Sequence, residues 1–192
     1  MINIKTNRLL LRQWRDTDLE QFVAINQDPK VMRYLPKVLS HDEVQQMISK
    51  MKLSITKNGY GFYACEEKSS ALCIGFIGLN KPSFKAHFTP CVEIGWRLGS
   101  QYWNQGYATE GAKAVLDFGF HELSFPEIVS FTVPNNKASI RVMEKIGLIL
   151  SPKESFLHPL LPQNHKLSKH VLYRLKKSEY KNLKHSSFSS EK

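Results

Sequence analysis

The stretch that decides the fold is Trp103-Asn104-Gln105-Gly106-Tyr107-Ala108-Thr109-Glu110. It follows an apolar run from Val92 to Leu98 that predicts a β-strand, and it leads into a helix that begins with small residues. A strand, a glycine-containing turn and a helix start together form a phosphate-binding geometry, because free backbone N–H groups and the positive end of the helix dipole face an anion there. The alternative is a plain strand–helix connection that needs one glycine.

Composition indicates one globular domain with a full core, because 42% of the 192 residues are hydrophobic and 11% are aromatic. No segment is long and apolar enough to span a membrane, and the start, Met1 to Lys5, does not resemble a secretory leader. Cys65, Cys73 and Cys91 lie in or beside predicted strands. An odd number of buried cysteines is typical of reduced core residues, so we expect a cytoplasmic protein. No Cys/His spacing predicts a metal site.

The formal net charge is +10, and residues 150–192 carry nine Lys or Arg and three Asp or Glu, which is +6 of that charge. A basic surface could meet nucleic acid, an acidic membrane or a polyanionic cofactor. No nucleic-acid motif accompanies the charge, so a solvated basic tail is the favoured interpretation. We expect residues 1–182 to form the domain and the polar, serine-rich residues 183–192 to be disordered.

The hydrophobic periodicity predicts one mixed α/β domain with the order strand, two helices, three strands, helix, strand, helix and two strands. Capping boxes are expected at Thr17/Glu20 and at Ser40/Glu43. Asn136 is expected to cap a helix that Gly147 ends. The predicted strands are 9–13, 60–65, 72–79, 92–98, 128–133, 150–156 and 171–175.

Two separate blocks resemble the GNAT superfamily of N-acetyltransferases. The apolar strand and the turn after it resemble the acetyl-CoA motif of that superfamily, and Pro134-Asn135-Asn136-Lys137-Ala138-Ser139 with Glu144-Lys145-Ile146-Gly147-Leu148 resembles its next block. The start, Asn7-Arg8-Leu9-Leu10-Leu11-Arg12, resembles the Rim-type branch, whose best-known members acetylate ribosomal-protein N-termini. The resemblance runs from about Thr6 to Lys177. It implies a mostly antiparallel, splayed mixed sheet flanked by helices, and acetyl-CoA as co-substrate.

The resemblance also implies which residues bind the cofactor. Trp103 departs from the usual Arg or Gln at the first turn position, so the pyrophosphate is expected to be held mainly by backbone amides, with charge supplied by Arg141 or Lys137. The amide-rich pantetheine arm can pair with the strand before the turn like an added strand; the alternative for that strand's side chains is plain core. The expected cofactor-binding residues are Ile94, Gly95, Trp96, Leu98, Trp103, Asn104, Gln105, Gly106, Tyr107, Ala108, Thr109, Asn136 and Arg141.

Acetyl transfer to an amine needs a base, a stabilised oxyanion and a proton for the leaving thiolate. Glu93 is the one acid in the apolar strand and is the candidate base, although alternation places it on one face with Gly95 and Arg97, where it could instead be solvated. Backbone N–H groups near 94–96 could form the oxyanion hole. Ser139 is the candidate acid by resemblance, because the superfamily's more usual tyrosine is absent; the alternative is a serine in a first helical turn.

The acceptor is expected to be an amine. Tyr34, Tyr60 and Phe62 come from regions that flank the acceptor channel in this superfamily, although core packing would also explain each of them. A protein N-terminus is the first expectation. A polyamine, an amino acid or an aminoglycoside is the second, with polycations disfavoured because residues 27–37 and 156–169 are mostly neutral or basic. A catalytically silent GNAT-like domain that binds nucleic acid or acidic partners is the third. Rim-type enzymes are often homodimers.

Overall fold

The computed structural model describes residues 3–180, which belong to two compact units. The first unit comprises Met1–Asn80 and Ile94–Val115, and the second comprises Lys81–Glu93 and Leu116–Lys192. The expected domain end at residue 182 and the expected disordered tail, 183–192, lie outside the described residues. One strand and one helix of the fold each contribute residues to both units.

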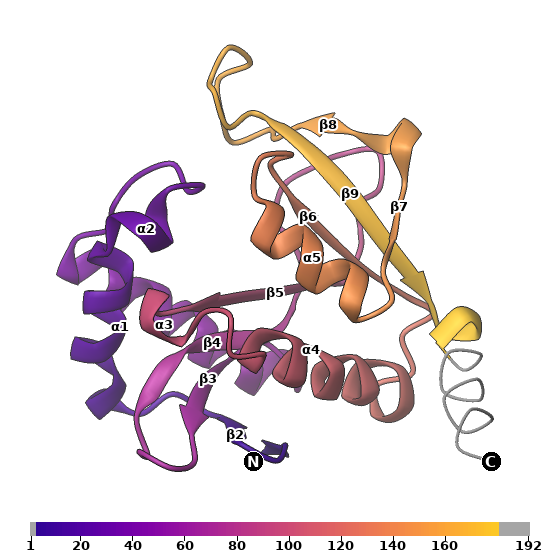
Figure 1. Ribbon diagram of the computed structural model, residues 1–192. Coiled ribbons are helices and arrows are strands. Elements are labelled where there is room, and N and C mark those ends of the chain that lie inside the picture. The colour runs from indigo at the N-terminus through magenta and orange to yellow at the C-terminus, as the bar shows by residue number, and fades with distance from the viewer. Residues whose placement is uncertain (1–2, 181–192) are drawn as a thin grey trace. The chain divides into compact units, whose positions relative to one another are not determined.

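The elements follow the predicted order, with short additions (Figure 1). The strands are β1 Ile4–Lys5, β2 Leu9–Arg12, β3 Phe62–Glu67, β4 Cys73–Asn80, β5 Glu93–Leu98, β6 Glu127–Thr132, β7 Ile149–Leu150, β8 Phe156–Leu157 and β9 Lys169–Lys176. The helices are α1 Leu19–Gln27, α2 Pro29–Met32, α3 His41–Asn58, α4 Tyr107–Asp117 and α5 Lys137–Lys145. A π-helical turn, Phe118–Glu122, extends α4.

The sheet of the first unit has the strand order β1-β2-β3-β4-β5, and β1 to β4 are antiparallel. Helices α1 and α3 cover one face, where their apolar side chains pack with Ala64 of β3 and Phe76 of β4. Helix α4 lies against the other face, because a Cβ on Gly111 would be 2.4 Å from Cδ1 of Ile77. Strands β3 and β4 thus lie between two helical layers.

Local signals set the start and end of α3 as predicted. The Ser40 hydroxyl accepts a hydrogen bond from the Glu43 N–H, and the Glu43 carboxylate accepts one from the Ser40 N–H. Gly59, with φ of 76°, ends the helix.

The capping box predicted at Thr17/Glu20 is wrong, because a single turn at 16–18 precedes α1, which begins at Leu19. The carboxylate of Asp18 is instead bound by the Arg12 guanidinium, through bonds of 2.7 and 2.8 Å. Asp18, the residue that precedes α1, therefore forms a tertiary ion pair with Arg12.

In the second unit, β6 pairs antiparallel with β9, and β9 also pairs with β7 and with β8. Glu93 pairs in parallel register with Val129, which makes the sheet mixed. The single strand predicted at 150–156 is wrong: β7 and β8 are separated by a turn at Pro152–Glu154, because proline has no N–H to donate to a ladder. The predicted mixed α/β class, with a mostly antiparallel sheet flanked by helices, is confirmed.

The three cysteines are free thiols, with Cys65 and Cys73 buried and Cys91 half-buried. Within residues 3–180, none of the helices combines the length and the apolar character needed to cross a bilayer.

Candidate functional site

The turn before α4 leads into backbone N–H groups that have no hydrogen-bond acceptor within the helix. Asn104 and Gly106 both have left-handed backbone conformations, with φ of 59° and 82°. The Glu110 N–H donates to the Gly106 carbonyl at 2.9 Å. The three preceding N–H groups, at 107–109, have no intrahelical acceptor because they lie in the first turn. Left-handed residues followed by a helix start form a concave set of donors that suits an anion.

Two side chains of this turn, those of Trp103 and Gln105, hold it in place by donating hydrogen bonds to backbone carbonyl groups. The Trp103 indole Nε1 donates to the Leu98 carbonyl at 2.9 Å, which ties the turn back to the end of β5. The Gln105 amide donates to the Gln101 carbonyl at 2.8 Å. Trp103 therefore uses its one polar hydrogen inside the protein, and the backbone is left as the anion-facing part of the turn.

Arg8 supplies the positive charge at this turn. Its Nη1 donates to the Gln105 carbonyl at 2.9 Å and its Nε to Oε2 of Glu110 at 2.7 Å. The guanidinium lies 4.3 Å from the centre of the Tyr107 ring, and Nη2 is 3.4 Å from the position of a Cβ on Gly106. Sequence analysis missed this role and looked to Arg141 and Lys137. The available signal was that Arg8 belongs to the motif at the start of the chain.

Glu110 joins Arg8 to the helix start. Its Oε1 accepts from the Thr6 hydroxyl at 2.6 Å and from the Arg8 backbone N–H at 2.8 Å. Partial burial raises the pKa of Glu110, but the hydrogen bonds from Thr6 and Arg8 outweigh burial and hold that pKa below its usual value. The carboxylate therefore stays charged at neutral pH and keeps the segment before β2 attached to the turn.

Strand β5 buries two of the expected cofactor residues and leaves two half-buried. Ile94 and Leu98 are 1% and 5% exposed, so their side chains belong to the core and only their backbones could contact a ligand. Gly95 and Trp96 are half-buried. Gly95 faces the ring of Phe62, since a Cβ there would lie 3.1 Å from Cε1 of that ring.

Of the three expected acceptor residues, Phe62 lines a cavity of about 410 Å³ in the first unit. Tyr34 and Tyr60 are half-buried and are not part of its lining. The Arg33 guanidinium lies 5.4 Å from the centre of the Tyr34 ring, and the Tyr60 carbonyl accepts a hydrogen bond from Ser54. The structure therefore places Phe62 at a cavity large enough for a small ligand, and Tyr34 and Tyr60 outside its lining.

The second unit contains Glu93, Asn136, Ser139 and Arg141. Asn136 is a helix cap: its Oδ1 accepts from the Ser139 N–H at 3.3 Å, and its Nδ2 donates to Oγ of Ser139 at 3.2 Å. The Ser139 hydroxyl thus accepts one hydrogen bond and keeps its own hydrogen for a further acceptor. This arrangement suits a hydroxyl that donates a proton.

Glu93 is half-buried at the start of β5, and Arg141 is exposed on α5. Burial raises the pKa of the Cys91 thiol to about 11, and the nearby Glu93 carboxylate adds to that rise.

Comparison with known proteins agrees with these features. Residues 8–149 match the family model described as an acetyltransferase (GNAT) domain. The chain is 31% identical over 180 residues to the uncharacterized N-acetyltransferase YnaD of Bacillus subtilis (strain 168), covering 93% of this chain and 99% of that protein.

Solved structures share the fold. A GNAT-family acetyltransferase from Bacillus anthracis superimposes with a TM-score of 0.77 at 27% identity, covering 93% of this chain and all of the other (100%). A spermidine N-acetyltransferase from Vibrio cholerae, solved with CoA and spermine, has a TM-score of 0.70 at 19% identity, covering 91% and 99% of the two chains. This second likeness shows the fold alone.

The family match covers well over half of the chain, and it begins at Arg8, the residue that binds the Gln105 carbonyl in the turn before α4. Members of this family take acetyl from acetyl-CoA. The chain belongs to the GNAT acetyltransferase family and is an acetyl-CoA-dependent N-acetyltransferase.

Proposed function

We propose that this enzyme belongs to the Rim-type branch and transfers acetyl directly to a primary amine in a ternary complex, with a protein N-terminal amine as one candidate acceptor. The observation that carries the proposal is the turn at 104–109. There, backbone N–H groups that have no acceptor within the helix lie beside the Arg8 guanidinium. Such a turn suits the CoA pyrophosphate. The Rim-type assignment is supported by the opening motif, whose Arg8 and Arg12 both form ion pairs within the fold.

Each residue then has a defined role. The backbone of β5 pairs with the pantetheine arm, and its N–H groups near Gly95 face the oxyanion that forms when the amine nitrogen attacks the thioester carbon. Glu93 takes the proton that the amine loses, directly or through a water. As the carbon–sulfur bond breaks, Ser139 gives its hydroxyl proton to the departing thiolate. Ser139 then regains a proton from solvent, and Glu93 releases the proton that it took from the amine. The products are an acetamide and free CoA thiol.

Calorimetric titration with acetyl-CoA tests the cofactor assignment. We expect one binding site per chain, and no heat of binding at high acetyl-CoA concentration would contradict the assignment. A thiol-release assay over a panel of amines and peptides then identifies the acceptor.

Glu93→Gln tests the base. We expect a fall in kcat of about 10²–10⁴-fold, the range typical of a general base, and loss of the rise in rate with pH that deprotonation of Glu93 produces. Glu122→Gln, an exposed residue of the same unit, is the matched control and should retain the wild-type profile. An unchanged rate in Glu93→Gln would remove this residue from the mechanism.

A further inference from the structure

A cluster of phenylalanine and histidine rings lies within the second unit, and the proposed acetyl transfer makes no use of it. The rings come from the loop before β5, from β6 and from the hairpin of β8 and β9 (Figure 1), and they belong to Phe84, Phe88, Phe131, Phe156, His158 and His170. The loop before β5 leads directly to Glu93. The cluster therefore anchors the segment that precedes the candidate base.

His158 contacts both the loop and β9. Its ring centre lies 4.7 Å from that of Phe84 and 5.0 Å from that of His170. Its backbone N–H donates to the Ser168 carbonyl at 2.8 Å, on the other side of the hairpin. The imidazole of His158 therefore lies where the loop before β5 meets the hairpin.

A backbone hydrogen bond requires the neutral form of His158. The Leu160 N–H donates to Nδ1 of His158 at 3.3 Å. An imidazole nitrogen accepts a hydrogen bond only while it carries no proton, so the one proton of the neutral ring is on Nε2. Protonation of the ring would put a hydrogen on Nδ1, opposite the Leu160 N–H, and this bond would be lost. The turn at 158–160 is therefore closed only while His158 is neutral.

His170 has its proton on the other nitrogen. Its Nδ1 is 3.0 Å from the Ser168 carbonyl oxygen, and a carbonyl can only accept, so Nδ1 carries the proton of the neutral ring. Protonation of His170 keeps this bond, but it places a positive ring 5.0 Å from the centre of the His158 ring. A charge on either histidine therefore disfavours a charge on the other.

The titratable groups in or next to the cluster are Cys91 and His87 from the loop, Glu154 from the turn before β8, and His170 and Arg174 from β9. The Glu154 carboxylate is bound by Arg174 at 2.6 and 2.7 Å, and it lies 3.6 Å from Nε2 of His87. Protonation of His87 would strengthen that pairing and so would act against release of the loop. Burial lowers the pKa of His158 and of His170, and the nearby His170 lowers the pKa of His158 further.

From this geometry we propose that His158 and His170 form a pH-sensitive latch, which holds the loop before β5 against the hairpin while both rings are neutral and releases it when His158 is protonated. A released histidine takes up a proton near the ordinary pKa of about 6.5. The latch is therefore closed above that pH and weakens as the pH falls below it. An effect on turnover follows through Glu93 and rests on the proposed function, whereas the release of the loop does not.

Nitrogen-15 NMR of the histidine side chains tests the latch without any substrate, with His158→Asn and His170→Asn to assign the signals. At about pH 7.5 we expect the proton of His158 on Nε2 and that of His170 on Nδ1, and we expect both rings to titrate below the ordinary histidine pKa. The same tautomer in both rings, or titration of His158 at or above the ordinary value, would overturn the proposal.

Amide hydrogen exchange measures the release. The reporters are the Leu160 N–H, which donates to His158, and the Ala86 N–H, which donates to Oγ1 of Thr89 at 2.9 Å within the loop. After correction for the intrinsic exchange rate, both should exchange at least about threefold faster at about pH 5.5 than at about pH 7.5, because protonation favours the open form. Equal corrected rates at the two pH values would contradict the latch.

Two substitutions of His158 separate its hydrogen bond from its ring contact. The side chain in His158→Asn can accept from the Leu160 N–H, as in an Asx turn, and does not titrate, so this amide should stay protected at both pH values. The side chain in His158→Phe keeps a ring against Phe84 without an acceptor, so the Leu160 amide should exchange fast at both pH values. The Ala86 amide should lose most of its pH response in both variants.

His121→Asn is the matched control, because His121 is an exposed histidine of the same unit outside the hairpin. It should keep the wild-type response of both amides. A full wild-type response in His158→Asn would exclude His158 as the group that opens the latch.

Profiles of kcat/KM against pH connect the latch to turnover. On the acid side, the wild-type rate should begin to fall at a higher pH than the rate of His158→Asn, and the two should agree above about pH 7.5. If no amine is acetylated, the proposed transfer fails while amide exchange still decides the latch. If the amides respond to pH and the two profiles coincide, the latch has no role in turnover and that part of the proposal is wrong.

Discussion

At the residue scale, Arg8 links the start of the chain to the cofactor turn, as its bonds to Gln105 and Glu110 show. The Gln105 carbonyl accepts a hydrogen bond from the Arg8 guanidinium. The same guanidinium adds a positive charge beside the turn. Arg8 is therefore a positioning residue that also favours an anionic ligand.

We expect Arg8→Ala to weaken acetyl-CoA binding about tenfold, or ~1.4 kcal/mol, with kcat less affected than the KM for acetyl-CoA. Calorimetric titration and steady-state kinetics measure the two effects. Lys5→Ala, an exposed cation of the same segment, is the control and should bind normally. Equal acetyl-CoA affinity in wild type and Arg8→Ala would show that the turn does not need this contact.

Two glycine substitutions, at Gly106 and Gly59, separate the effect of backbone strain on stability from an effect on acetyl-CoA binding. With φ of 82°, an alanine there is strained although only one side-chain atom lies within 4 Å of its Cβ, so Gly106→Ala should cost about 1 kcal/mol of unfolding free energy and weaken acetyl-CoA binding. Gly59→Ala carries comparable strain at the end of α3, with φ of 76° and an open environment. We expect it to lose similar stability in urea unfolding and to bind acetyl-CoA normally. Equal binding by the two variants would contradict a specific role for Gly106.

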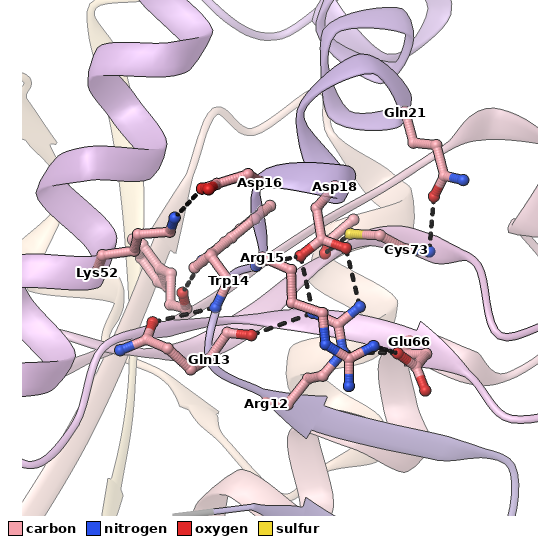
Figure 2. Close-up of polar contacts among 12 residues, drawn as sticks. Arg12, Gln13, Trp14, Arg15, Asp16, Asp18, Gln21, Lys52, Glu66 and Cys73 are labelled. Atoms are coloured by element: carbon pink, nitrogen blue, oxygen red, sulfur yellow. Dashed lines mark hydrogen bonds and ion pairs between the residues drawn. The ribbon is translucent and has the colours of Figure 1, made fainter. Parts of the chain in front are cut away.

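At the element scale, a buried ion network joins β2, β3 and the turn before α1 (Figure 2). Arg12 bonds Asp18 through two nitrogens and Glu66 through Nε, and Arg15 reaches Glu66 from the surface. Burial lowers the pKa of Arg12, but the hydrogen bonds with Asp18 and Glu66 outweigh it and raise that pKa. In this network the two positive charges are therefore balanced by two negative charges, on Asp18 and Glu66.

Removing one carboxylate from this network should be costly. Asp18→Asn leaves Arg12, with its side chain only 5% exposed, short of a counter-ion, and we expect a loss of about 3–5 kcal/mol in the free energy of urea unfolding. Asp16→Asn is the matched control, because its side chain is 99% exposed and pairs with Lys52 at the surface (Figure 2). It should change stability little. Comparable losses in both variants would mean that burial does not set the strength of these pairs.

At the scale of the whole molecule, the chain passes between its two units three times, after Asn80, Glu93 and Val115. Two of these crossings fall inside β5 and α4. If one unit unfolded alone, β5 and α4 would both be broken, because each contributes residues to both units. This connectivity favours cooperative unfolding.

We expect one urea transition. Trp14, Trp96 and Trp103 all lie in the first unit, so tryptophan fluorescence reports that unit, whereas far-ultraviolet circular dichroism reports both. Coincident midpoints from the two probes are the expected result. A second midpoint seen only by circular dichroism would show that the units unfold separately.

Features that depend on near neighbours in the chain were open to sequence analysis. The caps of α3 and α5 and the glycine of the cofactor turn follow from residues within about four positions of one another. The continuous apolar run of β4 and the apolar residues of β5 likewise indicate strands without further information. The turn before α4, the element order and the resemblance to the GNAT superfamily could therefore be derived from the amino-acid sequence.

Only the tertiary structure decided the contacts that give these elements their chemistry. Arg8 and Gln105 are 97 residues apart, and no periodicity relates them. The desolvation of Arg97 beside Asn26 likewise depends on how α1 packs against β5. Local backbone preferences act within a few residues, whereas burial and charge pairing arise when distant segments pack. For that reason the sequence by itself determined the family and the glycine-containing turn before α4, and only packing revealed the arginine at that turn and the one beside Asn26.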